Sequence, residues 1–368
     1  MPEYRFMISG GGTGGHIFPA VAIADELKRR YPKAKFLFVG ANDRMEMERV
    51  PQAGYHIEGL WISGIQRKLT ASNLLFPFKL FSSLARSQGL IRKFKPDVVI
   101  GTGGFASGPL LYVASRKNKP CLIQEQNSYP GITNKLLAPR VRRICVAYDK
   151  MERFFPKEKI VFTGNPIRSS VHSKVESKQA CYEELGLNPN RKTMLVLGGS
   201  LGARKINQLI ENNLEYILKM NVNLLWQTGK LYYDNLIQKH GSKQNDQLQI
   251  KAFLQNMQET YAIADAVISR AGAGTLSELA VLQKATLLIP SPNVAEDHQT
   301  KNAMALVEKE AALIFRETDP EKEFRKKLKQ LMDDSSKSKL EKNIRALAKP
   351  DAAEHIADEI VKLLPNAG

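Results

Sequence analysis

Short, mostly apolar runs alternate with longer amphipathic runs along this chain of 368 residues. Continuous apolar runs are typical of parallel strands buried on both faces, and amphipathic runs between them are typical of crossover helices. The strand-like runs of the first half are YRFMIS, KFLFVG, DVVIG, CLIQEQ, RICVA and KIVFTG. This alternation predicts an α/β fold with doubly wound parallel sheets.

The same plan occurs twice. An apolar run, a glycine turn and a helix-like run follow one another from Ile8 to Leu27, and the same succession returns from Thr193 to Ile210. A chain of this length is also too long for one compact core. We therefore predict two Rossmann-like domains facing each other across a cleft, residues 1–164 and 165–346. A final helix, about 347–368, is predicted to pack back on the first domain.

Glycine-rich loops follow several of the predicted strands. They are GGGTGGH (10–16), GTGGFASGP (101–109), GGSLGA (198–203) and RAGAGTLSE (270–278). Backbone N–H groups and a helix N-terminus at such a turn bind phosphate well, and glycine lets the ligand approach the backbone. Loops of this kind in both halves indicate two phosphorylated ligands. The first loop lacks the Gly-Lys-Ser/Thr of a Walker A motif. The acidic residue typical of a nicotinamide-cofactor site is missing from the end of the second strand, where FVGAND offers only Asp43 beyond a glycine.

The net charge of +17 is concentrated in residues 1–150, which contain 23 Lys and Arg against 10 Asp and Glu. This excess predicts an anionic partner there: nucleic acid, a phosphorylated substrate or an anionic membrane surface. Cys121, Cys145 and Cys181 have no disulfide or zinc spacing and suit a reducing cytosol. We expect neither a secretion signal nor a membrane-spanning helix, which needs roughly 20 apolar residues.

One segment combines basic and apolar residues. Between Gly59 and Pro96 there is no acidic residue, whereas LLFPFKLFSSL, from Leu74 to Leu84, is strongly apolar. The basic residues of this segment are Arg67, Lys68, Lys79, Arg86, Arg92, Lys93 and Lys95. An apolar patch with a basic rim is typical of binding to an anionic lipid surface. An ordinary core helix with a solvated basic face remains the alternative.

Several stretches occur in one order and together closely resemble the MurG family. They are GGGTGGHIFPAVAIADEL, GTGGFASGP, QEQNSYPGITNK, TGNPIR, GGSLGA, RAGAGTLSE and DHQTKNA. The resemblance extends over nearly the whole chain. It implies the GT-B fold and a transferase that moves N-acetylglucosamine from UDP-N-acetylglucosamine to lipid I, giving lipid II for peptidoglycan. It further implies that the first domain binds the membrane-bound acceptor and the second domain the nucleotide sugar.

The resemblance also implies a setting and site residues. The setting is the cytoplasmic face of the bacterial cell membrane, with cell-wall synthesis proteins as further partners and no cofactor. Thr13, Gly14 and Gly15 would line the junction of donor and acceptor. His16 stands at a helix start, which favours a neutral ring able to accept a proton, so it is a candidate general base.

Glu125 and Asn127 follow a predicted strand in QEQNSYPG. Glu125 is the alternative general base, and Asn127 is a candidate hydrogen-bond donor to sugar or acceptor; an Asx-type turn before Pro130 would explain both without a ligand. The family usually has histidine where this chain has Gln124, so no role is assigned to that position.

The remaining candidates belong to the donor. Arg168 and Ser200 would bind diphosphate oxygens, and Leu254 would contact uracil through its backbone. Glu278 would accept hydrogen bonds from the ribose hydroxyls, and Gln299 would contact the transferred sugar. The start of the helix in AGAGTLSE would face phosphate with Ala273, Gly274, Thr275, Leu276 and Ser277. Asp297 and His298 are adjacent, but the spacing of ligand-type residues predicts no metal site.

Two other classes of function remain open at this point. The same fold could carry a UDP-N-acetylglucosamine 2-epimerase or a glycolipid transferase with another acceptor. The charge could instead serve a nucleic-acid-binding protein without enzymatic activity, although no recognisable nucleic-acid motif is present and we expect no nucleic-acid partner.

Overall fold

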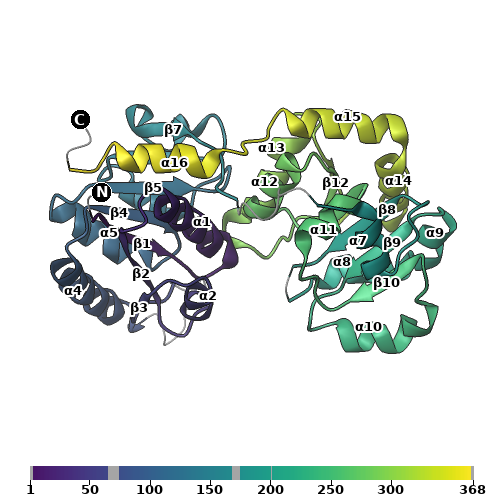
Figure 1. Cartoon of the computed structure of the whole chain (residues 1–368), viewed down its shortest axis with the longest axis horizontal. Coiled ribbons are helices and arrows are strands. Elements are labelled where there is room, and N and C mark those ends of the chain that lie inside the picture. The colour runs from purple at the N-terminus through teal and green to yellow at the C-terminus, as the bar shows by residue number, and fades with distance from the viewer. Residues whose placement is uncertain (1–2, 65–73, 168–174, 200, 366–368) are drawn as a thin grey trace. The chain divides into compact units, whose positions relative to one another are not determined.

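The structure is a computed structural model that describes residues 3–64, 74–167, 175–199 and 201–365. The chain divides into two compact units (Figure 1). Unit 1 comprises Met1–Arg168 together with Lys349–Gly368, and unit 2 comprises Ser169–Ala348. The C-terminal segment therefore belongs to the same unit as the N-terminus.

The described part of unit 1 contains a parallel sheet of seven strands. In sheet order they are β3 (Ile57–Leu60), β2 (Lys35–Ala41), β1 (Arg5–Gly10), β4 (Val98–Gly103), β5 (Cys121–Glu125), β6 (Arg143–Val146) and β7 (Ile160–Phe162). The strand order reverses between β1 and β4, which is the ligand-binding position of a doubly wound fold.

Helices cover both faces of this sheet. They are α1 (Gly14–Arg30), α2 (Glu46–Gln52), α4 (Phe76–Phe94), α5 (Ser107–Arg116), α6 (Ile132–Leu137) and α16 (Ala352–Val361). Successive side chains of β1 point to opposite faces of the sheet, so each face needs a layer of helices. Met7 packs with α4, α5 and α6, whereas Phe6 and Ile8 pack with α1 and α16. The C-terminal helix α16 lies against α1, where Arg30 pairs with Asp358 (Nη1–Oδ1 2.5 Å).

The described part of unit 2 repeats this plan with six parallel strands. In sheet order they are β10 (Leu248–Lys251), β9 (Asn223–Gln227), β8 (Thr193–Leu197), β11 (Ala266–Ser269), β12 (Ala285–Leu288) and β13 (Leu313–Ile314). Its helices are α7 (Lys178–Leu185), α8 (Arg204–Asn212), α9 (Leu214–Lys219), α10 (Tyr233–His240), α11 (Met257–Ile263), α12 (Ala273–Val281), α13 (His298–Val307), α14 (Glu321–Met332) and α15 (Asp334–Arg345). The order reverses between β8 and β11.

Local sequence accounts for several helix ends. Helix α7 begins after Ser177, whose hydroxyl accepts the N–H of Ala180 (3.2 Å), and ends at Gly186 with φ 69°. Helix α4 has Pro77 in its first turn and ends at Lys95, which is left-handed (φ 53°) and precedes Pro96. None of the helices in the described residues is both long and apolar enough to cross a bilayer.

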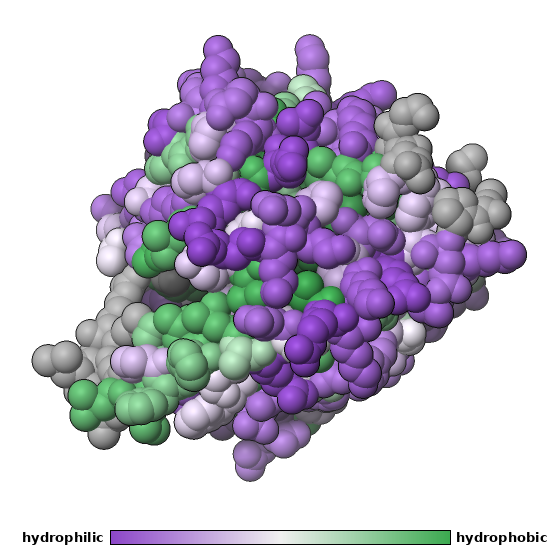
Figure 2. Space-filling model, turned by 90° about the vertical axis from the view of Figure 1, so that its left-hand side faces the viewer, coloured by the Kyte–Doolittle hydropathy of each residue, from purple (hydrophilic) through white to green (hydrophobic). Residues whose placement is uncertain are grey.

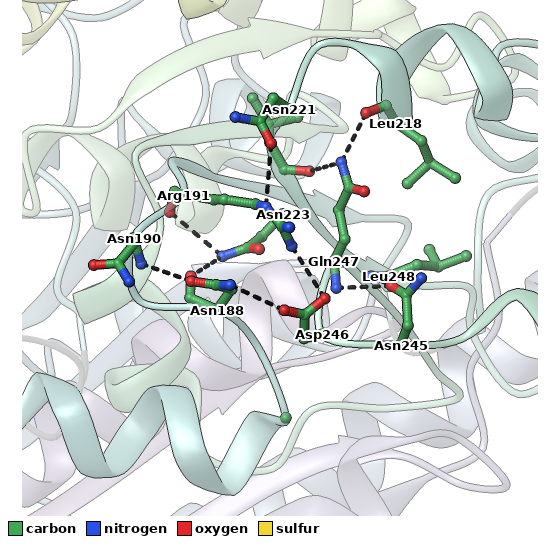
Figure 3. A network of polar contacts seen from close by, with 12 residues as sticks. Asn188, Asn190, Arg191, Leu218, Asn221, Asn223, Asn245, Asp246, Gln247 and Leu248 are labelled. Carbon is green, nitrogen blue, oxygen red and sulfur yellow. Dashed lines mark hydrogen bonds and ion pairs between the residues drawn. The ribbon is translucent and has the colours of Figure 1, made fainter.

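A polar network closes the edge of the unit 2 sheet at which β8, β9 and β10 begin (Figure 3). Asn223, which is fully buried, donates its amide N–H to Asn188 O (2.7 Å). Asp246 accepts hydrogen bonds from Asn188 (2.9 Å) and Arg191 (3.1 Å), which hold the pKa of its carboxyl below the usual value. These side chains fasten three loops and lie at the opposite end of the strands from the glycine loops.

Candidate functional site

Two glycine-rich loops of unit 1 touch where β1 and β4 end. The N–H of Gly11 donates to Gly103 O (3.4 Å), and a Cβ atom on Gly104 would lie 2.3 Å from the carbonyl oxygen of Gly11. Gly103 and Gly104 have φ values of 99° and 83°, which strain any residue with a side chain. The fold therefore requires glycine at these two positions, whether or not a ligand binds.

Gly15 differs from these glycines. A Cβ atom placed there would meet only Thr13 Oγ1, at an ordinary contact distance of 3.6 Å. Thr13 and Gly15 are exposed at the start of α1, and the Thr13 side chain makes no capping hydrogen bond. Backbone N–H groups at a helix start that lack helical partners bind anions well. Glycine at 15 thus leaves space for a ligand against the backbone, beside Gly14.

Glu46 is a buried carboxylate that sequence reasoning missed. It is 0% exposed, and its Oε2 accepts the N–H of Gly12 (2.9 Å) while its Oε1 accepts the N–H of Ala41 (3.0 Å). A Cβ atom on Gly11 would lie 2.1 Å from Oε1, so glycine is also needed at that position. Glu46 fixes the first glycine loop from the protein side. The stretch DRMEMERV reads as an ordinary helix start and gave no signal of this role.

His16 lies half-buried in the first turn of α1. Its Nδ1 is 2.9 Å from the carbonyl oxygen of Thr102 and 3.0 Å from Oε1 of Gln126. A backbone carbonyl only accepts hydrogen bonds, so Nδ1 carries the hydrogen and Nε2 keeps its lone pair. A Cβ atom on Gly103 would lie 2.8 Å from Nδ1, so glycine there makes room for the ring. The arrangement selects one tautomer with Nε2 as the basic atom.

Gln126 was also missed, although strand alternation could have found it. Side chains two residues apart along an extended backbone point to the same side, so Gln126, which directly follows β5, is expected on the side of Gln124 and opposite to Glu125. Both glutamines are buried, at 0% and 1% exposed. The amide nitrogen of Gln126 donates to the carbonyl oxygen of Thr102 (2.7 Å), the group that also accepts from His16.

Glu125 is 1% exposed and its two oxygens are fully engaged. Oε1 accepts the backbone N–H (3.0 Å) and the side-chain amide (3.1 Å) of Asn127. Oε2 accepts the side-chain amide of Asn134 (2.8 Å) and the N–H of Gly131 (3.2 Å), which precedes α6. A general base needs an available lone pair within reach of the substrate. Glu125 therefore has less lone-pair capacity left for a proton than Nε2 of His16, and it holds Asn127 by two hydrogen bonds.

In unit 2, helix α12 begins at the carboxyl end of β11, as the sequence pattern predicts. Gly272 precedes its first turn with extended dihedrals (φ −70°, ψ 138°), and a Cβ atom on Gly274 would meet nothing within 4 Å. Ala273 and Leu276 are buried, whereas Thr275 is half-buried. The Ser277 hydroxyl donates back to Ala273 O (3.0 Å). The open side of this helix start is therefore formed by Gly274 and Thr275.

Glu278 and Gln299 each accept a hydrogen bond from a neighbouring residue of unit 2. Tyr261 donates its hydroxyl to Glu278 Oε2 (3.4 Å), and the N–H of Ser291 donates to Gln299 Oε1 (2.9 Å). With its oxygen engaged, Gln299 offers amide N–H groups as donors. These contacts orient the two side chains that the sequence assigned to the ribose and to the transferred sugar.

Leu254 is 4% exposed, and its backbone N–H donates to Oε1 of Gln227 (2.9 Å). The amide nitrogen of Gln227 in turn donates to Gly199 O (3.2 Å). Gln227, the last residue of β9, therefore ties the loop after β10 to the glycine loop after β8. Sequence reasoning did not single it out, because it ends a strand like any other. Arg168 and Ser200 lie outside the described residues.

Cysteine and metal chemistry find little support in the part of the chain that the structure describes. There, no group of three or more His, Cys, Asp or Glu side chains is arranged to hold a metal ion. Cys121 is buried, and burial raises the pKa of its thiol to about 12. Such a thiol stays protonated and is a poor nucleophile.

Comparison with known proteins identifies the family. Residues 6–146 match the glycosyltransferase family 28 N-terminal domain, and residues 193–358 match the glycosyltransferase family 28 C-terminal domain. The chain is 54% identical to a UDP-N-acetylglucosamine–N-acetylmuramyl-(pentapeptide) pyrophosphoryl-undecaprenol N-acetylglucosamine transferase from Flavobacterium psychrophilum, over 99% of each chain. A protein of the same name from Christiangramia forsetii is 53% identical over 98% of each chain. This chain belongs to the MurG family.

The crystal structure of MurG from Acinetobacter baumannii has the same fold as this chain. It is 28% identical, with a TM-score of 0.77 over 98% of this chain and 100% of that one. The predicted GT-B fold with two Rossmann-like domains is thereby confirmed. A UDP-N-acetylglucosamine 2-epimerase, 13% identical with a TM-score of 0.63 over 98% of this chain and 96% of that one, shares the fold alone.

Membership of the MurG family makes Gln124 notable, because the resemblance implies histidine at that position. In this chain the Gln124 amide nitrogen donates to Asn165 Oδ1 (2.9 Å), and its Oε1 accepts from the amide nitrogen of Gln126. A neutral imidazole also offers one donor and one acceptor. The substitution therefore preserves the hydrogen-bonding capacity of the position.

Proposed function

We propose that this chain transfers N-acetylglucosamine from UDP-N-acetylglucosamine to the 4-hydroxyl of the muramyl sugar of lipid I. The product is lipid II, the precursor for peptidoglycan. The observation that carries this proposal is the 54% identity, over 99% of each chain, to a transferase named for that reaction. The helix starts at α1 in unit 1 and α12 in unit 2 support it, because backbone N–H groups at such positions suit the diphosphate of each substrate.

Unit 1 is the acceptor domain in this proposal. The diphosphate of lipid I lies against the start of α1, where Thr13, Gly14 and Gly15 leave the backbone accessible. The exposed Arg44 adds a cation at this edge, since its guanidinium lies 5.8 Å from the centre of the Phe105 ring on the second glycine loop. Arginine suits diphosphate because its planar fork donates two hydrogen bonds at once.

His16 acts as the general base. Its Nε2 takes the proton from the 4-hydroxyl while that oxygen attacks the anomeric carbon of N-acetylglucosamine. The bond from that carbon to the diphosphate breaks at the same time, and UDP leaves with the electron pair. Attack from the opposite face inverts the anomeric carbon, so an α-linked donor gives a β-1,4 product. Asn127, held by Glu125, donates a hydrogen bond to the acceptor.

Unit 2 is the donor domain. The start of α12, from Ala273 to Ser277, binds the UDP diphosphate, because a helix start stabilises the charge of the leaving group. Glu278 accepts the ribose hydroxyls, Leu254 contacts uracil and Gln299 donates to hydroxyls of the transferred sugar. Arg168 and Ser200, outside the described residues, keep their sequence-based assignment to the diphosphate.

An apolar face on α4 is the proposed membrane surface. Leu74 (77% exposed), Phe78 (68%) and Phe81 (75%) are the most exposed hydrophobic residues around this helix. Figure 2 shows hydrophobic residues gathered at the lower left of the face it draws, at the height at which Figure 1 shows α4. Arg92, Lys93 and Lys95 add positive charge to the same segment, whereas Arg86 is paired with Glu58 (2.7 Å). The enzyme is therefore proposed to bind anionic lipid at the cytoplasmic face of the cell membrane, where lipid I and other cell-wall synthesis proteins are found.

The deciding experiment is transfer of radiolabelled N-acetylglucosamine to a short-chain analogue of lipid I. We expect a labelled disaccharide lipid and release of one UDP for each sugar transferred. Conversion of UDP-N-acetylglucosamine to UDP-N-acetylmannosamine without an acceptor would instead indicate a 2-epimerase. Labelling of a different glycolipid would indicate another transferase of the same fold. Nucleic-acid affinity measured beside that for UDP-N-acetylglucosamine tests the remaining alternative, and we expect only the nucleotide sugar to bind specifically.

A further inference from the structure

A series of buried amide groups runs from His16 to Asn165, near the point at which the N-terminal segment of unit 1 ends. Its members are Gln126, Gln124 and Asn165, which are 1%, 0% and 3% exposed. Amides buried this deeply must be hydrogen-bonded, because an unpaired buried polar group destabilises the fold by about 1–3 kcal/mol. Each of the three is bonded to the next.

Two backbone carbonyls fix the direction of this series. The Gln126 amide nitrogen faces Thr102 O (2.7 Å), so Oε1 of Gln126 is the atom that faces His16. At the other end, the Asn165 amide nitrogen faces Gln126 O (3.0 Å), so Oδ1 of Asn165 accepts from Gln124 (2.9 Å). That leaves Oε1 of Gln124 to accept from Gln126. Within the series, the side-chain amide of Gln126 therefore donates to Gln124, and that of Gln124 donates to Asn165, so an oxygen atom of Gln126 is left to face His16.

We propose that Gln126, held by Gln124 and Asn165, is a positioning residue that fixes His16 in the tautomer with hydrogen on Nδ1. This inference rests on the proposed function, in which Nε2 of His16 takes the proton of the acceptor hydroxyl. When Nε2 is protonated, the hydrogen on Nδ1 points at two oxygen atoms, Thr102 O and Gln126 Oε1, which stabilise the positive ring.

The chemistry of the amide suits this task. A carboxylate at position 126 would add a buried charge, which is costly to desolvate. The neutral amide of Gln126 presents an oxygen atom to His16 without that cost. A hydrophobic residue at 126 would leave Nδ1 with a single acceptor and would allow the ring to rotate. Asn165 directly precedes Pro166, close to the end of the N-terminal segment of unit 1 at Arg168. The series of amides therefore also links His16 to the end of that segment.

The test uses the full chain and two independent measurements. Gln126→Met keeps the length of the side chain and removes its hydrogen bonds. At metal sites, removal of the group that orients a ligating histidine typically lowers activity about 10- to 100-fold, and we take the same range for His16. We expect a fall of that size in kcat, with KM for UDP-N-acetylglucosamine within about twofold of the parent. Nitrogen-15 spectra of the imidazole, assigned by comparison with His16→Ala, should show loss of the single Nδ1–H tautomer.

Position 124 supplies a rescue. Gln124→Met should move both measurements in the same direction as Gln126→Met. Gln124→His restores one donor and one acceptor, so it should return kcat and the tautomer close to the parent. The matched control is Asn223→Leu, which removes an equally buried amide at the far edge of the unit 2 sheet. It should lower the melting temperature and leave kcat and the His16 spectrum unchanged.

The proposal is overturned if folded Gln126→Met retains both the parental kcat and the Nδ1–H tautomer, or if Asn223→Leu reproduces its effects. The tautomer is measured without substrate. It therefore decides the positioning role even if the parent chain transfers no sugar, an outcome that would overturn the proposed function alone.

Discussion

The variant Gly15→Ala tests whether glycine is needed at position 15 for ligand binding, as opposed to folding. The added methyl group would meet only Thr13 Oγ1, at 3.6 Å, so it fits the unliganded structure. Alanine is more favourable than glycine within a helix by up to about 1 kcal/mol. The variant should therefore be as stable as the parent or slightly more stable, with a melting temperature up to about 4 °C higher.

Activity should respond in the opposite way. If the acceptor diphosphate lies against this helix start, the methyl group displaces it from the backbone N–H groups. Loss of one hydrogen bond to a charged group corresponds to about 1.5–3 kcal/mol, or about 10- to 150-fold. We expect kcat/KM for the lipid I analogue to fall by that factor at saturating UDP-N-acetylglucosamine, while KM for the nucleotide sugar stays unchanged.

Two further glycines serve as controls. Gly54 has φ 82° and open space around it, so Gly54→Ala carries only the backbone strain of about 1–2 kcal/mol and should retain activity. Gly104→Ala adds a contact of 2.3 Å with the Gly11 carbonyl and should be the least stable of the three variants. Full activity of Gly15→Ala toward the acceptor would refute a ligand role for this glycine, as would a loss of activity that parallels loss of stability.

Four other outcomes are expected. His16→Ala should lower turnover about 100-fold without unfolding the chain, and a fall of under threefold would remove His16 as the base. Glu125→Gln should lower the melting temperature, because the new side-chain nitrogen would face the two N–H donors that one carboxylate oxygen now accepts. The same substitution of a freely exposed base would not have this effect. Phe78→Ser with Phe81→Ser should abolish sedimentation with anionic vesicles at low salt, and unchanged sedimentation would exclude the α4 patch as the membrane surface. Burial lowers the pKa of Lys284 to about 8, so the folded state disfavours the charged form of this side chain. Lys284→Met should therefore be more stable than the parent at pH 7. In urea titrations, this difference in the free energy of unfolding should shrink by about 3 kcal/mol as the pH rises from about 8 to about 10.5, because the parent then loses the buried charge.

The doubly wound topology could be predicted from the sequence, because buried parallel strands leave continuous apolar runs. Both strand orders, however, depend on which strands pair, and pairing between β1 and β4 joins residues about 90 positions apart that share no local pattern. The glycine loops were visible for a related reason: glycine is a strong local signal. The sequence did not distinguish Gly104, which packs against Gly11, from Gly15, which faces open space.

The side chains that support the site were harder to find. Glu46 and Gln126 act on residues 34 and 110 positions away, so their roles depend entirely on tertiary contacts. Glu125 illustrates the same dependence on tertiary contacts. A carboxylate at the end of a strand is a reasonable candidate base, but its hydrogen bonds to Asn127, Gly131 and Asn134 cannot be read from residue type.

Glu46 and Glu125 together suggest how unit 1 remains suited to an anionic substrate. Both carboxylates are buried and both accept backbone N–H groups of loops at the carboxyl edge of the sheet. Their negative charge therefore serves to fix the loops and is directed into the protein. Gly15 and Arg44, which are exposed at this edge, are neutral and positive. A diphosphate bound as proposed would meet exposed N–H groups and a cation there, while Glu46 and Glu125 lie behind the backbone. Replacing Glu46 with glutamine should consequently disturb acceptor binding through the shape of the loop, and a normal KM for lipid I in a stably folded Glu46→Gln variant would contradict that reasoning.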